Sequence, residues 1–215
     1  MGIDQKLEQL AQSLIEGNHL LVERLTEELL HEGAAPRVIL DRGLMPGMDV
    51  VGRRFKEGEI FLPHVLVSAR SMKASMKILD PLLAQSSYKA KGKIMLGTVR
   101  GDVHDIGKNL VGIMLRGAGY EVVDVGIGCS AEQFAELCAL HKPDVLGLSA
   151  LLTTTMTYMK VVIETLATNG TLIPVIVGGA PLNERFAREI GAAGYSRNAA
   201  DSVRLVKSVM SGEKL

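Results

Sequence analysis

The spacing of apolar residues changes once along this 215-residue chain, near residue 93, and this change constrains the fold most strongly. Before it, leucines recur every three or four residues, as in "LEQLAQSLIEG" (7–17) and "HLLVERLTEELLHEG" (19–33). This spacing indicates amphipathic helices. After it, short apolar runs of strand length alternate with helical segments. We therefore expect an N-terminal helical bundle followed by an α/β domain.

The helical part is expected to contain four or five helices. Met45-Pro46-Gly47 predicts a break between two of them, and Pro63 predicts the first turn of a helix that runs to about Leu79. The stretch "AQSSYKAKGK" (84–93) is polar and has no apolar period. These features predict a helical cap domain, a linker and a Rossmann-like domain at residues 1–85, 86–92 and 93–215.

Five apolar runs in the second part are predicted to be strands, each followed by a helix. They are residues 93–99, 120–126, 144–150, 173–179 and 194–196. Strands joined through helices form a parallel sheet with helices on both faces, so we expect a flavodoxin-like, doubly wound, five-stranded sheet. Such sheets bind ligands beyond the carboxyl ends of their strands. The unusual polar and glycine residues follow these ends, at 98–107, 149–155 and 178–179.

Composition argues against several classes of protein. Lys plus Arg and Asp plus Glu both number 24, and Trp is absent, which disfavours a nucleic-acid binder. No uninterrupted apolar run reaches the roughly 18 residues of a membrane span, and the start lacks a signal-peptide pattern, so we expect a cytoplasmic protein. The spacing of Cys129 and Cys138 matches no paired metal site.

The loop "DVHDIG" (102–107) places an aspartate two residues before a histidine. A turn could bring the Asp102 carboxylate to one nitrogen of His104, which would fix the tautomer and raise the basicity of the other nitrogen. Gly101 and Gly107 flank the pair and permit a bulky ligand to approach the backbone. A surface loop capped by aspartate is the alternative reading of these residues. The loop lacks the Walker-A and dinucleotide-binding glycine patterns.

Three motifs follow one another on successive strand ends: Asp102-x-His104-x-x-Gly107, Ser149-x-Leu151 and Gly178-Gly179. Together they resemble the signature of cobalamin-binding domains of the base-off, His-on type. Residues 51–72 resemble the helical cap that precedes this domain in methionine synthase and in small corrinoid proteins of anaerobic methyltransferase systems. The resemblance covers nearly the whole chain and implies a free-standing corrinoid protein of the methanol, methylamine or quaternary-amine type.

The resemblance also implies roles for individual residues. His104 would be the metal ligand, replacing the benzimidazole below cobalt, and Asp102 with Thr155 would complete a proton relay. Phe55 and Leu62 would cover the upper, methyl-bearing face of the corrin, and the displaced nucleotide tail would lie in a slot lined by the other motifs. The residues implied to contact cobalamin are Gly101, Asp102, Val103, His104, Asp105, Ile106, Gly107, Ser149, Leu151, Thr153, Gly178, Gly179, Phe55 and Leu62.

The function implied by the resemblance is methyl transfer through cobalt. A substrate:corrinoid methyltransferase would form methyl-Co(III) on the protein, a second methyltransferase would pass the methyl group to coenzyme M or tetrahydrofolate, and a reductive activase would restore Co(I). The chain would be the corrinoid subunit of this system and not catalytic alone. No nucleic-acid or membrane partner is expected.

The sequence departs from the family pattern in a few places. Thr155 stands where methionine synthase has serine, and Ala193 and Asn198 stand where relatives often have aspartate, so no site residue is assigned to the last two positions. Two other functions remain open. One is cobalamin storage or sensing without methyl transfer. The other is a flavodoxin-like module that binds a phosphorylated ligand at the helix N-terminus after Gly107.

Overall fold

The computed structural model describes residues 2–85 and 89–212. The chain forms two compact units, one helical and one built on a sheet, and the boundary between them falls between Lys89 and Ala90 along the sequence. Residues 86–88 of the predicted linker lie outside the described residues.

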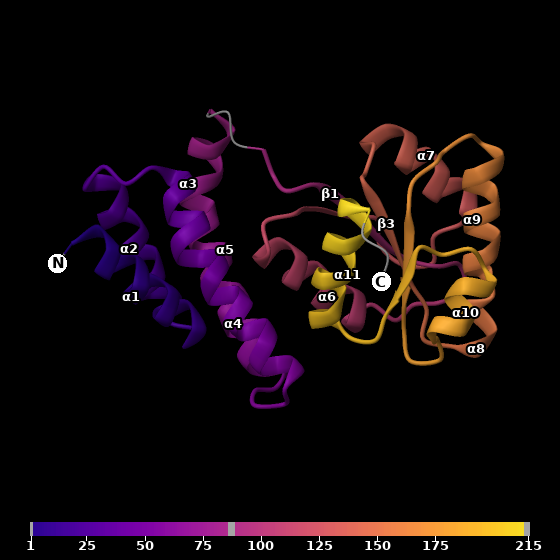
Figure 1. Ribbon diagram of the computed structural model, residues 1–215, viewed down its shortest axis with the longest axis horizontal. Helices are drawn as coiled ribbons and strands as arrows, with labels where there is room; N and C mark the ends of the chain where they lie inside the picture. Colours follow the sequence, from indigo (N-terminus) through magenta and orange to yellow (C-terminus); the bar gives the residue numbers. More distant parts are fainter. Residues whose placement is uncertain (1, 86–88, 213–215) are drawn as a thin grey trace. The chain divides into compact units, whose positions relative to one another are not determined.

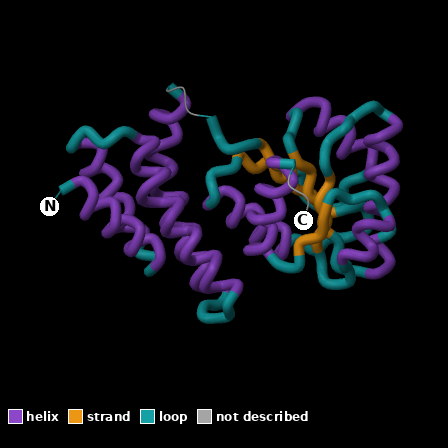
Figure 2. Tube along the Cα trace, viewed as in Figure 1, coloured by secondary structure: helices purple, strands orange, loops and turns teal. Residues whose placement is uncertain are grey.

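The N-terminal unit consists of helices joined by short loops (Figures 1 and 2), and apolar residues of these helices form its core. Its helices are α1 (Ile3–Ile15), α2 (His19–His31), α3 (Pro36–Ile39), α4 (Met45–Lys56) and α5 (Leu62–Ala84), with a π-helical turn η1 (Leu40–Leu44) between α3 and α4. The residues at three- and four-residue spacing are buried, among them Leu7, Leu10 and Leu14 of α1 and Leu25 and Leu29 of α2. Periodicity therefore identified this core correctly.

Two predicted helix boundaries are wrong, and proline is the cause in both cases. No break occurs at Met45-Pro46-Gly47, because the π-helical turn ends there and Pro46 lies in the first turn of α4, where its missing N–H is tolerated. Helix α5 does not stop near Leu79 but continues through Pro81 to Ala84. Burial of Leu79 and Leu83 offsets the hydrogen bond that Pro81 cannot make.

The sheet unit is the predicted flavodoxin-like α/β fold. Its strands are β1 (Lys93–Thr98), β2 (Glu121–Asp124), β3 (Val145–Ser149), β4 (Val175–Gly178) and β5 (Gly194–Ser196). All pair in parallel in the order β2-β1-β3-β4-β5. The connecting helices are α6 (Ile106–Gly117), α7 (Ala131–His141), α8 (Thr153–Met156), α9 (Tyr158–Thr168), α10 (Glu184–Glu189) and α11 (Ala199–Ser211). Helices α6 and α11 cover one face of the sheet, and α7 and α9 cover the other (Figure 1).

The strand order reverses direction between β1 and β3, and this switch point defines where a ligand can enter. From β1 the chain moves outward to β2, then returns to β3 on the other side of β1. The loops after β1 and β3 therefore diverge and leave a crevice at the carboxyl ends of these strands.

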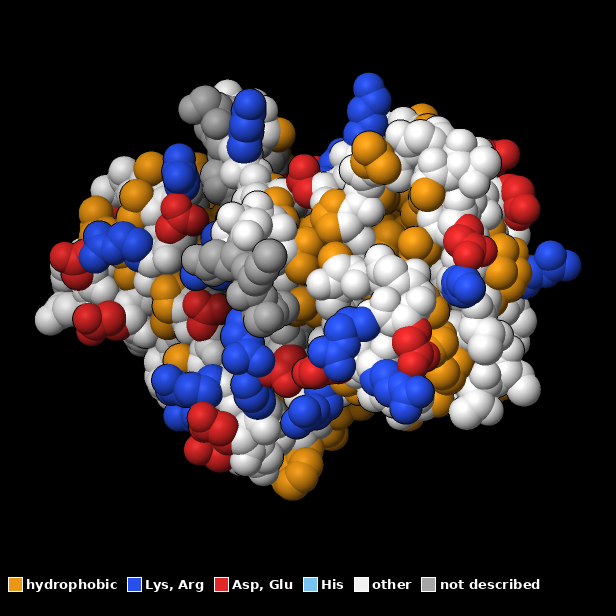
Figure 3. Space-filling view, turned by 45° about the vertical axis from the view of Figure 1, so that its right-hand side comes forward, with side chains coloured by type: hydrophobic (Ala, Val, Ile, Leu, Met, Phe, Trp, Pro, Cys, Tyr) orange, Lys and Arg blue, Asp and Glu red, His pale blue; other side chains and the backbone are white. Residues whose placement is uncertain are grey.

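The surface carries no dominant charge on the face that Figure 3 shows. Lys and Arg side chains alternate there with Asp and Glu side chains, in keeping with the equal counts of the two kinds. Among the helices in the described part of the chain, none has both the length and the apolar character needed to cross a membrane.

Candidate functional site

The three sequence motifs meet at the switch point because strand register aligns their ends. Thr98 of β1 pairs with Ser149 of β3, and Ser149 pairs with Gly178 of β4. A cavity of about 700 Å³ opens at this edge of the sheet, and His104, Ser149 and Gly178 are among the residues that line it. Both its volume and its place at the switch point are typical of small-molecule sites.

Asp102 organises the loop that carries His104. Its side chain is fully buried, and its Oδ1 atom accepts a hydrogen bond of 3.0 Å from the His104 backbone N–H and lies 2.7 Å from His104 Nδ1. Its Oδ2 atom accepts bonds of 2.8 Å from the Leu151 N–H and 2.7 Å from the Thr155 hydroxyl. One carboxylate thus joins the loop after β1 to the loop after β3.

The charge state of Asp102 determines which nitrogen of His104 is available. Burial by itself raises the pKa of this carboxyl, but the hydrogen bonds from Thr155, His104 and Leu151 together hold the pKa well below its usual range. An ionised carboxylate only accepts hydrogen bonds, so the proton of the imidazole resides on Nδ1. The Nε2 atom is then left with its lone pair, on a side chain that is 46% exposed and lines the cavity. This is the arrangement that prepares a histidine for metal ligation.

A second set of polar contacts holds the other side of the same loop. Lys108 is only 5% exposed, and its ammonium group pairs with Asp124 at the end of β2 and donates to Asn109. Asn109 in turn donates to the Asp105 carboxylate at 3.0 Å. The residue after His104 is therefore tied to β2, although no sequence motif predicted this contact. Two features of the sequence could have indicated it: Lys108 interrupts the apolar pattern of α6, and Asp124 ends an apolar strand.

The opposite wall of the cavity depends on missing side chains. Gly179 has a φ of +141°, and a Cβ atom built on it would lie 1.8 Å from the carbonyl oxygen of Ala150. Gly178 lines the cavity, and a Cβ on it would meet the carbonyl oxygen of Ser196 at 3.5 Å, which is an ordinary contact. At position 179 the backbone conformation and the close Ala150 carbonyl require glycine. At position 178 a side chain would be tolerated by the backbone, and glycine only leaves more space in the cavity.

Most residues that the sequence predicted as cofactor contacts lie at this site. The ones that line the cavity are Val103, His104, Asp105, Ile106, Gly107, Ser149, Leu151, Gly178 and Gly179. Asp102 and Thr155 are buried beside it. Gly101 and Thr153 are not among the lining residues, so a role for either in cofactor binding stays a prediction. Val103 and Ile106 are 69% and 71% exposed, so two apolar side chains flank His104 at the surface.

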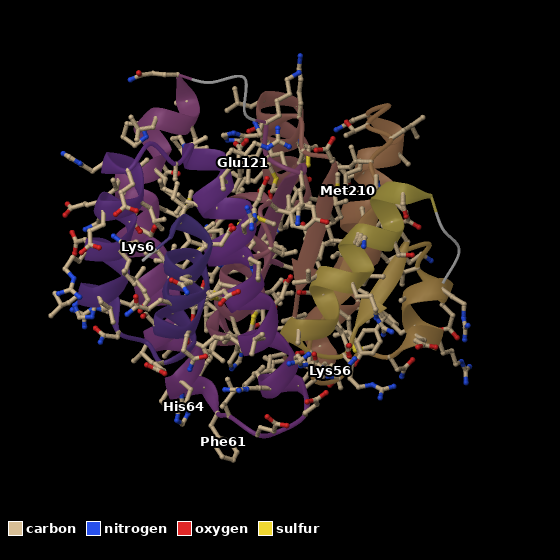
Figure 4. The ribbon with its side chains drawn as sticks, turned by 60° about the vertical axis from the view of Figure 1, so that its left-hand side comes forward. Lys6, Lys56, Phe61, His64, Glu121 and Met210 are labelled. Atoms are coloured by element: carbon tan, nitrogen blue, oxygen red, sulfur yellow. The ribbon has the colours of Figure 1, made fainter. Side chains whose placement is uncertain are left out.

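Phe55 and Leu62 belong to the helical unit and flank one loop of it. Phe55 lies in the last turn of α4 and Leu62 opens α5, and both side chains are partly buried. Phe61 between them is 67% exposed and points away from the helices near His64 (Figure 4). Backbone hydrogen bonds from Gly58 to Phe55 and from His64 to Phe61 close the loop.

The structure adds residues that the sequence did not indicate. The loop after β5 and the start of α11 form part of the cavity wall, through Ser196, Arg197, Asn198, Ala199 and Ser202. Of the two positions left unassigned in the sequence, Asn198 lines the cavity and Ala193 does not. Lys108 and Val111 of α6 line it as well.

Comparison with known proteins agrees with this geometry. Profiles of the family described as "B12 binding domain" match residues 92–204 and residues 6–80. A corrinoid protein of Desulfitobacterium hafniense is 42% identical over 95% of this chain and 97% of its own length. The dimethylamine corrinoid protein of Methanosarcina barkeri is 39% identical over 98% of this chain and all of its own.

Solved structures give the same result. A chain of the methanol:cobalamin methyltransferase complex MtaBC from Methanosarcina barkeri superimposes with a TM-score of 0.89 at 35% identity, covering 97% of this chain and 81% of that one. A cobalamin-binding protein from Desulfitobacterium hafniense superimposes with a TM-score of 0.76 at 30% identity, covering 94% and 97%. The chain therefore belongs to the B12-binding corrinoid proteins of anaerobic methyltransferase systems, and its cofactor is cobalamin.

The residues at the site suit this cofactor. The Nε2 atom of His104 is available to bind a metal, and the Asp102 carboxylate 2.7 Å from Nδ1 holds the imidazole ring in place. The exposed side chains of Val103 and Ile106 offer apolar contact to a flat macrocycle. The cavity beside them is large enough for a nucleotide, and its glycine wall admits a planar base close to the backbone.

Proposed function

We propose that this chain carries a methyl group on cobalamin bound base-off and His-on, with His104 Nε2 as the lower axial ligand and the nucleotide tail in the cavity. The observation that supports this most directly is the buried Asp102 carboxylate, which lies 2.7 Å from His104 Nδ1 and leaves Nε2 free at the cavity lining. Homologues that are named as corrinoid proteins support the carrier role.

When bound, cobalamin would supply a nucleophilic cobalt that accepts and releases the methyl group. The side chains of this protein would orient the cofactor and hold protons. His104 Nδ1 lies 2.7 Å from Asp102 Oδ1 and would donate its proton to that carboxylate, which leaves Nε2 for the metal. The Thr155 hydroxyl donates to Oδ2 at 2.7 Å, which supports a role for Thr155 in the relay. It would stabilise the ionised form of Asp102 and hence the ligating tautomer of His104.

The helical unit would protect the upper face of the corrin. Phe55 and Leu62 would exclude water from the methyl group and would have to move aside for each partner, so the length of the linker between the two domains should matter. Shortening the linker should then slow methyl transfer while cobalamin binding persists.

Three partners would complete the system. A substrate:corrinoid methyltransferase is supported by the relative that was solved in a methanol:cobalamin methyltransferase complex. A second methyltransferase would deliver the methyl group to coenzyme M or tetrahydrofolate, and a reductive activase would restore the reduced cofactor. Methylamines or methanol are the donor classes suggested by the names of the relatives.

The ligation is tested by EPR of the protein reconstituted with cobalamin, in the Co(II) state produced by photolysis of the methyl form. Protein that is labelled with ¹⁵N only in histidine separates a protein nitrogen from the benzimidazole nitrogen. We expect the superhyperfine pattern to change from a triplet to a doublet on labelling. The pattern should disappear in His104→Ala and persist in His141→Ala, a histidine of α7 that is not among the residues lining the cavity.

If the protein with ¹⁵N-labelled histidine still gave a triplet, the nitrogen bound to cobalt would belong to the benzimidazole of the cofactor. That result would refute His-on binding. Methyl transfer is measured separately, with methylcobalamin-loaded protein and a cognate methyltransferase. Tight His-on binding with no transfer by any partner would instead favour storage or sensing.

A further inference from the structure

The wall of the cavity that β5 and α11 provide contains several polar side chains, and most of them are already hydrogen-bonded within the wall. The Ser196 hydroxyl donates to the Asn198 carbonyl at 2.7 Å, and the Ser202 hydroxyl donates to the Ala199 carbonyl at 2.5 Å. The Asn198 side chain caps α11 by accepting from the Asp201 N–H at 2.9 Å, and its amide donates to the Asp201 carboxylate. These groups therefore shape the wall and have few donors left for a ligand.

Arg197 differs from its neighbours on this wall. Its side chain is exposed and lines the cavity, and it makes no hydrogen bond or ion pair with any residue of the described part of the chain. A guanidinium group has five N–H donors in a planar fork that matches two oxygens of a phosphate. All five remain available at this site.

The other cation of the cavity lining cannot take the same role. Lys108 is buried, and the Asp124 carboxylate neutralises its charge. Asp105, the lining carboxylate nearest to Lys108 in sequence, is also engaged, because it accepts a hydrogen bond from Asn109. Arg197 is therefore the lining residue whose positive charge is not balanced by a partner in the described structure.

Two features of the fold make Arg197 suitable for an anion. The residue directly precedes the N-terminal end of α11, a helix of 13 residues whose dipole adds partial positive charge there. Arg197 also follows β5, which is three strands from β1 and its His104 loop. At about 4.8 Å per strand, the two loops are separated by roughly 14 Å across the sheet. His104 thus offers a metal ligand on one side of the cavity, and Arg197 offers a positive charge on the far side.

We infer that Arg197 binds the phosphodiester group of the cobalamin nucleotide tail. This inference rests on the proposed His-on mode, because only then does the tail enter the cavity. The tail carries a single negative charge, and Arg197 is the unbalanced cation that faces it. Arg197 would position the tail through a charge-assisted bidentate contact, while Ser149 and the glycine wall would accommodate the base.

The test measures dissociation constants for three methylated ligands that differ only in the tail: cobinamide, cobinamide phosphate and cobalamin. We expect Arg197→Gln to weaken binding of cobalamin and cobinamide phosphate about 3- to 10-fold, the range for a partly exposed charge-assisted contact, and to leave cobinamide unchanged. Arg197→Lys should recover part of the loss, since a lysine keeps the charge without the fork. Arg188→Gln, an exposed arginine of α10 outside the cavity lining, makes the same change in net charge and should bind all three ligands normally.

The ionic strength of the solution gives a second readout. The difference between the protein and Arg197→Gln should shrink as salt rises from about 20 mM to about 500 mM, because an exposed ionic contact is screened. Equal loss of affinity for cobinamide, or no loss for cobinamide phosphate, would overturn the inference. Failure of the unaltered protein to bind any corrinoid would instead refute the proposed function, so the two failures are distinguishable.

Discussion

The two walls of the cavity are built in opposite ways. The wall after β1 is held in place by hydrogen bonds, with the Asp102 carboxylate holding His104, Leu151 and Thr155. The wall after β4 is defined by absent side chains, at Gly178 and Gly179. A ligating nitrogen must be oriented, whereas a planar group needs space along the backbone. Substitutions in the wall after β1 should therefore act by removing hydrogen bonds, and substitutions in the wall after β4 should act by adding atoms where there is no room.

The largest effect is expected in the glycine wall. Gly179→Ala should lower the free energy of unfolding by about 3 to 5 kcal/mol, because the new methyl group would meet a backbone oxygen at a φ that side chains avoid. Urea denaturation without cofactor measures this loss. Gly178→Ala is the matched control and should cost under about 1 kcal/mol in stability while weakening cobalamin binding. Equal stability of the two variants would contradict the steric account of this wall.

Asp102→Asn should have the next largest effect. The amide retains the shape of the carboxylate but presents an N–H₂ group to donors, so we expect a loss of about 2 to 3 kcal/mol in the free energy of unfolding. Urea denaturation measures this loss, and Asp105→Asn is the control. Asp105 takes part in an exposed hydrogen bond, so this variant removes the same charge and leaves the hydrogen bonds to Asp102 intact.

The same variant predicts a pH dependence. The folded-state pKa of Asp102 is depressed, so its contribution to stability is present above the unfolded pKa of about 3.9 and is lost as the pH falls toward the folded value. The difference in unfolding free energy between the protein and Asp102→Asn should be constant from about pH 7 to about pH 5 and should shrink below about pH 4. A difference that grew in acid would mean that the carboxyl is not ionised in the folded state.

Thr155 should show the smallest effect. Thr155→Val keeps the volume of the side chain and removes the hydroxyl, which donates to Asp102 and lies 3.1 Å from the Leu152 carbonyl oxygen, so a loss of about 1 kcal/mol in unfolding free energy is expected. Thr155→Ser retains the hydroxyl and should preserve the hydrogen bond. If the relay is correct, Thr155→Val should also weaken His104 ligation, measured by the fraction of protein with the labelled-histidine EPR pattern, and Thr155→Ser should not. Identical behaviour of the two variants would exclude a role for the hydroxyl.

Local features of the chain were sufficient for much of the site. The alternation of short apolar runs with helices predicted the parallel sheet, and residues that follow strand ends in such a sheet must gather at one edge. This is why His104, Ser149 and Gly178 could be placed together before any coordinates were known. In the structure Ser149 pairs with Thr98 and with Gly178, and His104, Ser149 and Gly178 line the same cavity.

Other features required long-range contacts that no local pattern contains. The Oδ2 atom of Asp102 accepts hydrogen bonds from residues 49 and 53 positions later in the chain. Lys108 is buried because Asp124 lies beside it. Proline predicted a break at residue 46, but the π-helical turn before it kept the chain helical.

Periodicity, a local property of the chain, predicted the fold class, and the resemblance of three motifs to cobalamin-binding domains implied the cofactor and a ligating role for His104. Three further answers came from the folded structure: which nitrogen of His104 is free, why residue 179 must be glycine, and which cation of the cavity has no partner among the described residues. Those three answers depend on hydrogen bonds and close contacts between distant segments, and such contacts exist only once the chain has folded.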